Sequence, residues 1–204
     1  EMDNNIAMIE INSETDFVAK NNEFIIFTEE VAQIALAKNG KMEEILKSKM
    51  KNEKKVNDNF VDLISKIGEK INLRRSSFIE NEKNLNFSYV HSAVKKNIGK
   101  IGVLLSLESN KSKNELMELG KQLAMQVAAT APLSIDETSL DQNILAKEKE
   151  IIIEELKNSG KDIKIVDKIA NGKMNKFIAD NTLLNQEWIM ETKKKVKDIL
   201  KEIG

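Results

Sequence analysis

Few side chains in this sequence could serve as a nucleophile, a general base or a metal ligand. Its 204 residues include no cysteine and a single histidine, His91. Thiolate chemistry is therefore excluded, a serine nucleophile would depend on His91 as its base, and His91 alone cannot hold an ordinary zinc ion. Carboxylates are numerous, but they lie mostly on lysine-rich stretches with helical spacing, where solvated charge is the usual outcome.

Nucleotide-binding loops are also missing from the sequence. It contains neither a GxxxxGK[ST] loop nor a GxGxxG motif after a predicted strand. We therefore expect a protein that is not an enzyme and has no cofactor of its own. A small hydrolase that uses paired carboxylates is an alternative, but no motif brings two acids together.

Asp16 and Phe17 place an acid and an aromatic ring in a polar stretch just before a predicted helix. One interpretation is that Phe17 packs back on the sheet or against the helix while Asp16 bonds to turn amides. The other is that Phe17 is an exposed anchor for another protein, since a ring buried at the centre of an interface can contribute ~2 kcal/mol. The residues alone leave both open and favour the packed arrangement.

Two further positions carry residue types that could contact a partner. His91 lies two residues after Tyr89, so both side chains occupy one face of a predicted strand. Arg74 and Arg75 are the only arginines, and adjacent strand residues point to opposite faces, so we expect at most one to pair inward. A solvated or helix-covering role is the commoner explanation for the arginine pair.

Hydrophobic spacing predicts an α+β protein in which helices alternate with short strands. A capping box at Ser112 and Glu115 opens one of the predicted helices, and Pro132 follows its end. The expected strands are 6–11, 71–79, 87–94 and 101–107, with a hairpin-like connection at 95–100. The expected helices run from Asn21 or Asn22 to Lys38, in two pieces within 41–66, and over 112–130, and a short strand and a final helix follow 188.

Two windows, 31–35 and 123–128, share an apolar rhythm with small residues. They suggest two related subdomains of helices packed on short antiparallel sheets, with a projecting antiparallel helical hairpin. We predict an N-terminal core subdomain at 1–85, a C-terminal core subdomain formed by 86–138 and 182–204, and the hairpin at 139–181. Its turn is expected at Gly160, and its apolar stripe comprises Ile144, Ile151, Ile152 and Leu156 on one arm and Ile165, Val166, Ile169, Met174 and Phe177 on the other.

The charge balance points away from nucleic acid and membranes as partners. Lysine and arginine number 32 against 33 acidic residues, which gives a formal charge of -1. The chain as a whole therefore has no positive electrostatic potential that would attract nucleic acid or an anionic membrane. No apolar run reaches the roughly 20 residues that span a bilayer, and no signal peptide is evident. We expect a cytoplasmic protein, or one of an organelle matrix. Because the sequence begins at Glu1 within a strand-like run, we also expect residues upstream.

The segment from Ile9 to Asn21, with Thr15-Asp16-Phe17-Val18-Ala19 at its centre, closely resembles the signature of the elongation factor Ts family. Members of that family are guanine-nucleotide exchange factors for the translational GTPase elongation factor Tu. Four further blocks resemble the family in the same order: 66–75 with the arginine pair, Tyr89 and His91 with 101–104, 124–129 with Pro132, and 168–177. Together they cover nearly the whole chain.

The resemblance implies that Thr15, Asp16, Phe17, Val18 and His91 bind elongation factor Tu. It implies that Asp16 and Phe17 enter the GTPase domain beside its nucleotide and magnesium, so GDP or GTP and magnesium belong to the partner. It also implies a structural arginine pair, a coiled-coil hairpin and a surface that could form a homodimer. A purely structural or assembly role remains the rival hypothesis from another class.

The sequence departs from the family pattern at three places. Compared with the family, we expect this sequence to lack the N-terminal helical module before Glu1 and the strand that usually follows the last helix after Gly204, and we expect a lower affinity for the partner as a result. The connection from Ser92 to Lys100 is longer and more charged than in the family. The geometry around His91 is therefore an open question.

Overall fold

The structure is a computed structural model that describes residues 1–2, 4–80, 84–158 and 163–203, without the side chains of 163–165. It confirms the α+β class, because helices alternate with short antiparallel sheets. The chain divides into two compact units, Glu1–Met125 and Gln126–Gly204. The proposed subdomain boundaries at 85, 138 and 182 stay a prediction. Within the described residues, no helix combines the length and the apolarity needed to cross a membrane.

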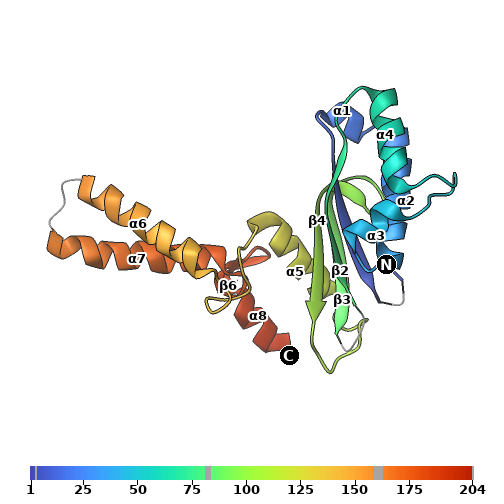
Figure 1. The fold of residues 1–204 in the computed structure, drawn as a ribbon. Helices are drawn as coiled ribbons and strands as arrows, with labels where there is room; N and C mark the ends of the chain where they lie inside the picture. The colour runs from blue at the N-terminus through green and yellow to red at the C-terminus, as the bar shows by residue number, and fades with distance from the viewer. Residues whose placement is uncertain (3, 81–83, 159–162, 204) are drawn as a thin grey trace. The chain divides into compact units, whose positions relative to one another are not determined.

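The first unit is formed by two strand pairs and their helices (Figure 1). Its elements are β1 (Ile6–Asn12), α1 (Asp16–Ala19), α2 (Asn22–Ala37), α3 (Met42–Lys47), α4 (Val56–Ile67), β2 (Asn72–Ile79), β3 (Leu85–Lys95), β4 (Ile98–Leu107) and most of α5 (Met117–Thr130). β1 pairs with β2 and β3 pairs with β4, both antiparallel. The predicted strands are thus confirmed with ends shifted by up to three residues.

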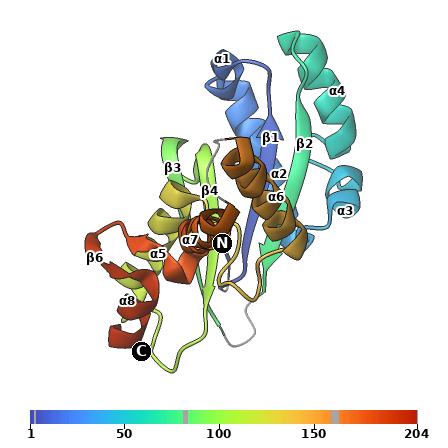
Figure 2. The same cartoon turned by 90° about the vertical axis from the view of Figure 1, so that its left-hand side faces the viewer.

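Helices α2, α3 and α4 lie on one side of the β1–β2 pair (Figures 1 and 2). The Asn21 side chain accepts hydrogen bonds from the amides of Glu23 and Phe24, so it is the N-cap of α2. Phe27 of α2 meets Phe60 of α4 edge to face, with ring centroids 4.7 Å apart. The buried core that these helices share is made of Val18, Phe24, Phe27, Val31, Ala35, Ile45, Met50, Val56, Phe60, Leu63 and Ile71.

The turn between β3 and β4 is tighter than the expected connection at 95–100. β4 already begins at Ile98, and Lys95 pairs with Ile98, so only two residues form the turn. Asn97 adopts a positive φ of 65° there, a conformation that asparagine tolerates better than most residues. The sequence pattern missed this because the charged side chains of 95–100 can lie on an exposed strand as well as in a loop.

The predicted capping box that precedes α5 is confirmed. The Ser112 amide donates to Glu115 Oε2 at 2.8 Å, and the Glu115 amide donates to Ser112 Oγ at 3.4 Å. The α-helix itself begins only at Met117, because the first turn is held by long bonds such as the 3.4 Å bond from the Met117 amide to the Asn114 carbonyl.

In the second unit, α6 (Gln142–Asn158) and α7 (Ile163–Asn181) lie antiparallel and side by side (Figure 1). The buried core between them consists of Ile152, Leu156, Val166 and Ala170. Ile144 and Ile151 are 36% and 52% exposed, so their place in the predicted stripe is wrong. Ile152 and Leu156 of that stripe are buried between the two helices, with Ile153 packed beside them. Gly160 and the Ile165 side chain lie outside what the structure describes.

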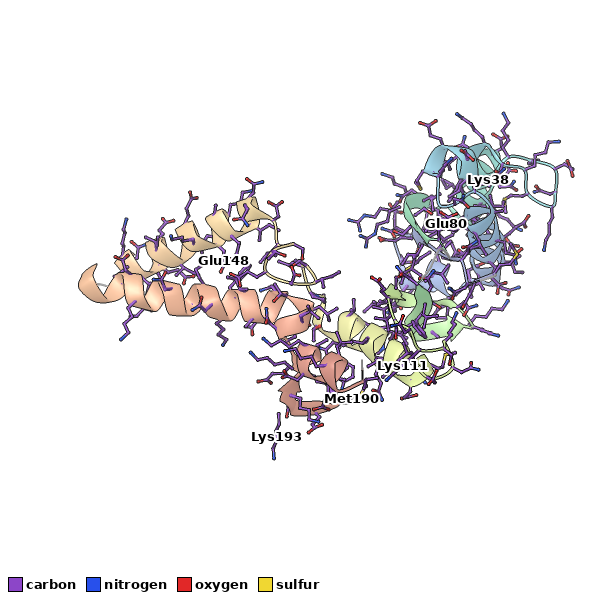
Figure 3. The ribbon with its side chains drawn as sticks, turned by 90° about the horizontal axis from the view of Figure 1, so that it is seen from below. Lys38, Glu80, Lys111, Glu148, Met190 and Lys193 are labelled. Atoms are coloured by element: carbon purple, nitrogen blue, oxygen red, sulfur yellow. The ribbon has the colours of Figure 1, made fainter. Side chains whose placement is uncertain are left out.

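The rest of the second unit is η1 (Leu183–Asn185), β5 (Glu187–Trp188), β6 (Glu191–Lys195) and α8 (Val196–Ile203). Fully buried Gln126, the first residue of the second unit, bonds within this region: its side-chain amide donates to Gln186 Oε1 and to the Glu187 carbonyl and accepts from the Ile189 amide. Because both its nitrogen and its oxygen are hydrogen-bonded, the buried amide avoids a desolvation cost of about 1–3 kcal/mol. Met190 and Lys193 are exposed at the β5–β6 turn and on β6 (Figure 3).

Gly120 lets α5 approach β3 closely. A Cβ placed there would lie 2.5 Å from the Phe87 ring, whereas a Cβ on Gly172 of α7 would meet nothing within 4 Å. We therefore expect Gly120→Ala to lower the free energy of unfolding by about 1–3 kcal/mol through overpacking. The matched variant Gly172→Ala should raise it by about 0.5–1 kcal/mol, because alanine favours a helix. Urea unfolding followed by circular dichroism measures both, and equal effects would contradict the close packing.

Candidate functional site

The antiparallel register of β1 and β2 brings two distant loops together. Asn12 at the end of β1 pairs with Asn72 at the start of β2. The chain that leaves β1 therefore runs beside the chain that enters β2, and Thr15 bonds to Glu69 across 54 residues of sequence. The loop that leaves β1 leads directly into α1.

Helix α1 directs two adjacent apolar side chains in opposite senses. Val18 is 7% exposed and belongs to the buried core, whereas Phe17 is 81% exposed. That is the highest exposed fraction of any large apolar side chain in the described part of the chain. The packed arrangement of Phe17 is therefore wrong, and Val18 rather than Phe17 anchors α1 to the core.

Asp16 and Thr15 complete this surface. The Asp16 carboxylate lies 3.4 Å from the Lys20 ammonium, with the two side chains 57% and 60% exposed. An exposed pair of this kind contributes only ~0–1 kcal/mol and exchanges readily for another partner. Thr15 is also exposed, but both its amide and its hydroxyl bond to Glu69.

His91 lies on the second strand pair of the first unit, opposite Ile101 of β4. Its Nδ1 is 3.1 Å from the Tyr89 hydroxyl, which fixes the direction of the exposed imidazole ring. Ile101 is 45% exposed, so the ring has an apolar neighbour on the open part of the sheet. After His91 the backbone is irregular, with φ of 50° at Ser92 and a register shift between Ala93 and Lys95.

Arg74 and Arg75 both bind Glu10, contrary to the expectation that adjacent strand residues diverge. Arg74 Nη1 donates to Glu10 Oε1 at 2.9 Å, and Arg75 Nε donates to Oε2. The register shifts between Glu10 and Ile11, whose partners are Arg75 and Leu73, so Arg74 is the extra residue of a β-bulge. A bulge rotates the extra residue out of strict alternation, and both arginines can then reach one carboxylate.

The two arginines lower the pKa of Glu10. Burial on the sheet is the largest single influence and raises that pKa, but the hydrogen bonds from Arg75, Arg74 and Asn12 together outweigh it. The arginine pair is therefore occupied within the sheet. Among the described residues, no group of three or more histidine, aspartate, glutamate or cysteine side chains could hold a metal ion.

Comparison with known proteins gives the family of the chain. A family model described as Elongation factor TS matches residues 14–204. The chain belongs to the elongation factor Ts family. Elongation factor Ts of Gluconobacter oxydans (strain 621H) is 38% identical over 201 residues, which are 98% of this chain and 67% of that relative.

Two further members of the elongation factor Ts family show the same extent of match. The protein of Methylobacterium nodulans is 41% identical over 197 residues, 96% of this chain and 64% of the relative. The protein of Rickettsia felis is 40% identical over 197 residues, 96% and 63% respectively. The chain thus spans about two thirds of the length of the curated relatives that it matches.

Glu69 is a residue of this candidate site that inspection of the sequence missed. It lies within a block that resembles the family, but its spacing from Thr15 gives no local signal. Pairing strand 6–11 with strand 71–79 in antiparallel register would have placed it beside Thr15, because residues that follow one strand then lie next to residues that precede the other.

The lowered pKa of Glu10 predicts a dependence of stability on pH. Since the folded-state pKa lies below the ordinary 4.5, the ion pairs stabilise the fold fully above that value and lose their effect as the pH falls through the folded pKa. Glu10→Gln should therefore lower the free energy of unfolding near pH 7 by about 1 kcal/mol and have a smaller effect as the pH falls toward 2.

A matched control for Glu10→Gln is Glu53→Gln. Glu53 pairs with Lys49 at 3.0 Å, but its side chain is 80% exposed, so its removal should change stability by only a few tenths of a kcal/mol, about 0.3. Urea unfolding of the three proteins at both pH values is the measurement. An effect of Glu10→Gln that persists undiminished in acid would show that charge is not its cause.

Proposed function

We propose that this chain is a guanine-nucleotide exchange factor for elongation factor Tu and that it acts by inserting Phe17, with Asp16 beside it, next to the partner's magnesium and nucleotide. The observation that supports the proposal most directly is the 81% exposure of Phe17 on a helix that is anchored by Val18. Its family and its relatives' name, Elongation factor Ts, agree with that role.

The exposed ring supplies binding free energy that the folded chain does not use. Burying a phenylalanine side chain is worth about 1.5–3 kcal/mol, and in free solution most of the Phe17 ring faces water. A side chain of this kind acts best when the segment behind it is held rigidly, because ordering it on binding would cost free energy. The buried Val18 and the two hydrogen bonds that Thr15 donates to Glu69 meet that requirement.

Exchange by insertion needs no chemistry from this chain. If Phe17 displaces the partner's elements that hold magnesium and phosphate, GDP binds less tightly to the complex than to the free GTPase. By linkage, GDP weakens the binding of this chain by the same factor. The nucleotide and magnesium belong to the partner in this proposal, and the chain has no cofactor of its own.

His91 provides a second contact with elongation factor Tu in this proposal. Its imidazole is exposed, is oriented by Tyr89 and adjoins Ile101, a combination that suits a polar and apolar contact at an interface. Thr15 and Val18 contribute through α1 rather than through free side chains. A homodimer and a cytoplasmic or organelle-matrix location remain predictions.

Phe17→Ala should abolish most of the acceleration of GDP release. Losing an anchor worth about 2 kcal/mol corresponds to a roughly 30-fold smaller rate at equal concentrations. The measurement is stopped-flow release of fluorescent GDP from elongation factor Tu mixed with the chain. Because the ring is exposed, the urea midpoint should not change.

The matched control is Val61→Ala on α4, which truncates another apolar side chain that is 59% exposed. It should leave GDP release unaltered. If the unsubstituted chain gives no acceleration, the exchange proposal is wrong and the assembly role gains support. Tight binding of GDP to the chain alone would contradict both.

His91→Ala should weaken binding to elongation factor Tu about 5-fold to 30-fold, the range for loss of ~1–2 kcal/mol at one contact. Tyr89→Phe keeps the neighbouring ring and removes only the hydroxyl that orients His91, so its effect should be smaller. Titration calorimetry with the nucleotide-free GTPase checks both. An unchanged affinity in His91→Ala would remove His91 from the proposed interface.

A further inference from the structure

The carboxylate of Glu69 binds the residue directly before Asp16 and Phe17 with both of its oxygens. Glu69 Oε2 accepts from the Thr15 amide at 3.0 Å, and Oε1 accepts from the Thr15 hydroxyl at 2.6 Å. Hydrogen bonds to an ionised acceptor are about twice as strong as neutral ones, and two parallel bonds also fix orientation. Glu69 is itself half-buried, which limits the number of positions that its side chain can take.

Helix α1 depends on this contact because it has little internal support. It is four residues long, and Thr15 stands at its N-cap position without making a side-chain cap bond. The hydroxyl that would ordinarily accept from an amide of the first turn donates to Glu69 instead. A single helical turn is unstable by itself, so the direction of α1 is set by what binds its two ends.

The loop that contains Glu69 is bonded in turn to the loop before α1. Gly68 ends α4 in the left-handed conformation, with φ of 81°, and the next amide but one, that of Lys70, donates to Glu14 Oε2 at 3.4 Å. Each loop thus gives an amide to a carboxylate of the other loop. This reciprocal pair of bonds joins the end of α4 to the start of α1.

We propose that Glu69 is a positioning residue for exchange: it sets the direction in which α1 presents Phe17, without itself touching the partner. The inference rests on the proposed function, because its consequence for exchange exists only if Phe17 is the inserting residue. Val18 holds α1 down on the core, and Glu69 fixes its rotation about that anchor.

Glu69→Ala removes both bonds and should lower the maximal rate of GDP release from elongation factor Tu by about 5-fold to 10-fold, with the concentration that gives half the maximal rate changed less. Glu69→Gln should restore most of that rate, since its amide oxygen can accept from the Thr15 amide while its nitrogen donates to the Thr15 hydroxyl. Thr15→Val removes one bond and should be intermediate. The double variant Glu69→Ala with Thr15→Val should be no worse than Glu69→Ala alone.

Glu23→Ala is the matched control, because Glu23 also joins two elements of this region through its ion pair with Lys66 but makes no hydrogen bond to Thr15. It should leave the rate unaltered. Amide hydrogen exchange in the free chain gives a readout that needs no partner. The Thr15 amide donates to Glu69 and the Ala19 amide donates to the Thr15 carbonyl, so protection of both should fall in Glu69→Ala and return in Glu69→Gln.

The outcomes separate this inference from the proposed function. If Phe17→Ala leaves GDP release unchanged, the proposed function fails, while amide exchange still reports on the contact between Glu69 and Thr15. If Phe17→Ala slows release but Glu69→Ala does not, the positioning role is wrong. Equal loss in Glu69→Ala and Glu69→Gln would overturn it as well, since the charge of Glu69 would then act on the partner directly.

Discussion

The antiparallel pairing of β1 with β2 is the constraint on which the candidate site depends. The register that joins Asn12 to Asn72 places the loop after β1 beside the loop before β2. A slip of one residue would turn every side chain of a strand to the other face, and the core formed with α2, α3 and α4 resists this because their apolar residues pack from one side. The position of Thr15 beside Glu69 is thus a consequence of burying that core.

The same constraint explains how a short helix can hold an aromatic ring in water. Val18 contributes to the core, and Thr15 is bound by Glu69, so α1 is fixed at both ends of its single turn. Neither attachment involves the Phe17 ring. The stability of the first unit and the exposure of the ring are therefore separate properties, and the ring can be used for binding without weakening the fold.

Local patterns in the sequence were sufficient for most elements. The N-cap at Asn21, the capping box at Ser112 and Glu115 and the strand alternation from Leu85 to Leu107 depend on residues close in sequence. The α+β class and the family resemblance follow from such patterns. The exposure of Phe17 does not follow from such patterns. Whether a ring next to a buried valine packs on the core or projects into solvent depends on the direction of α1.

Features that depend on contacts between distant segments could not be predicted. The bulge at Arg74 arises from the register of β2 against β1, and the contact stripe of α6 depends on how α7 lies against it. Glu69 belongs to the same class, since its partner is 54 residues away. The motif was therefore sufficient to predict Phe17 as a candidate site residue, whereas the contact of Glu69 with Thr15 follows only from the topology of the sheet.

We propose that this chain and GDP weaken each other's binding to elongation factor Tu through Phe17. The most direct measurement is the affinity of the chain for the GTPase by titration calorimetry, once free of nucleotide and once saturated with GDP and magnesium, for the unsubstituted chain and for Phe17→Ala. The account predicts tighter binding to the nucleotide-free form and a ratio of the two affinities that falls toward one in Phe17→Ala. Equal affinities for both forms of the GTPase, or a ratio that Phe17→Ala leaves unchanged, would contradict it.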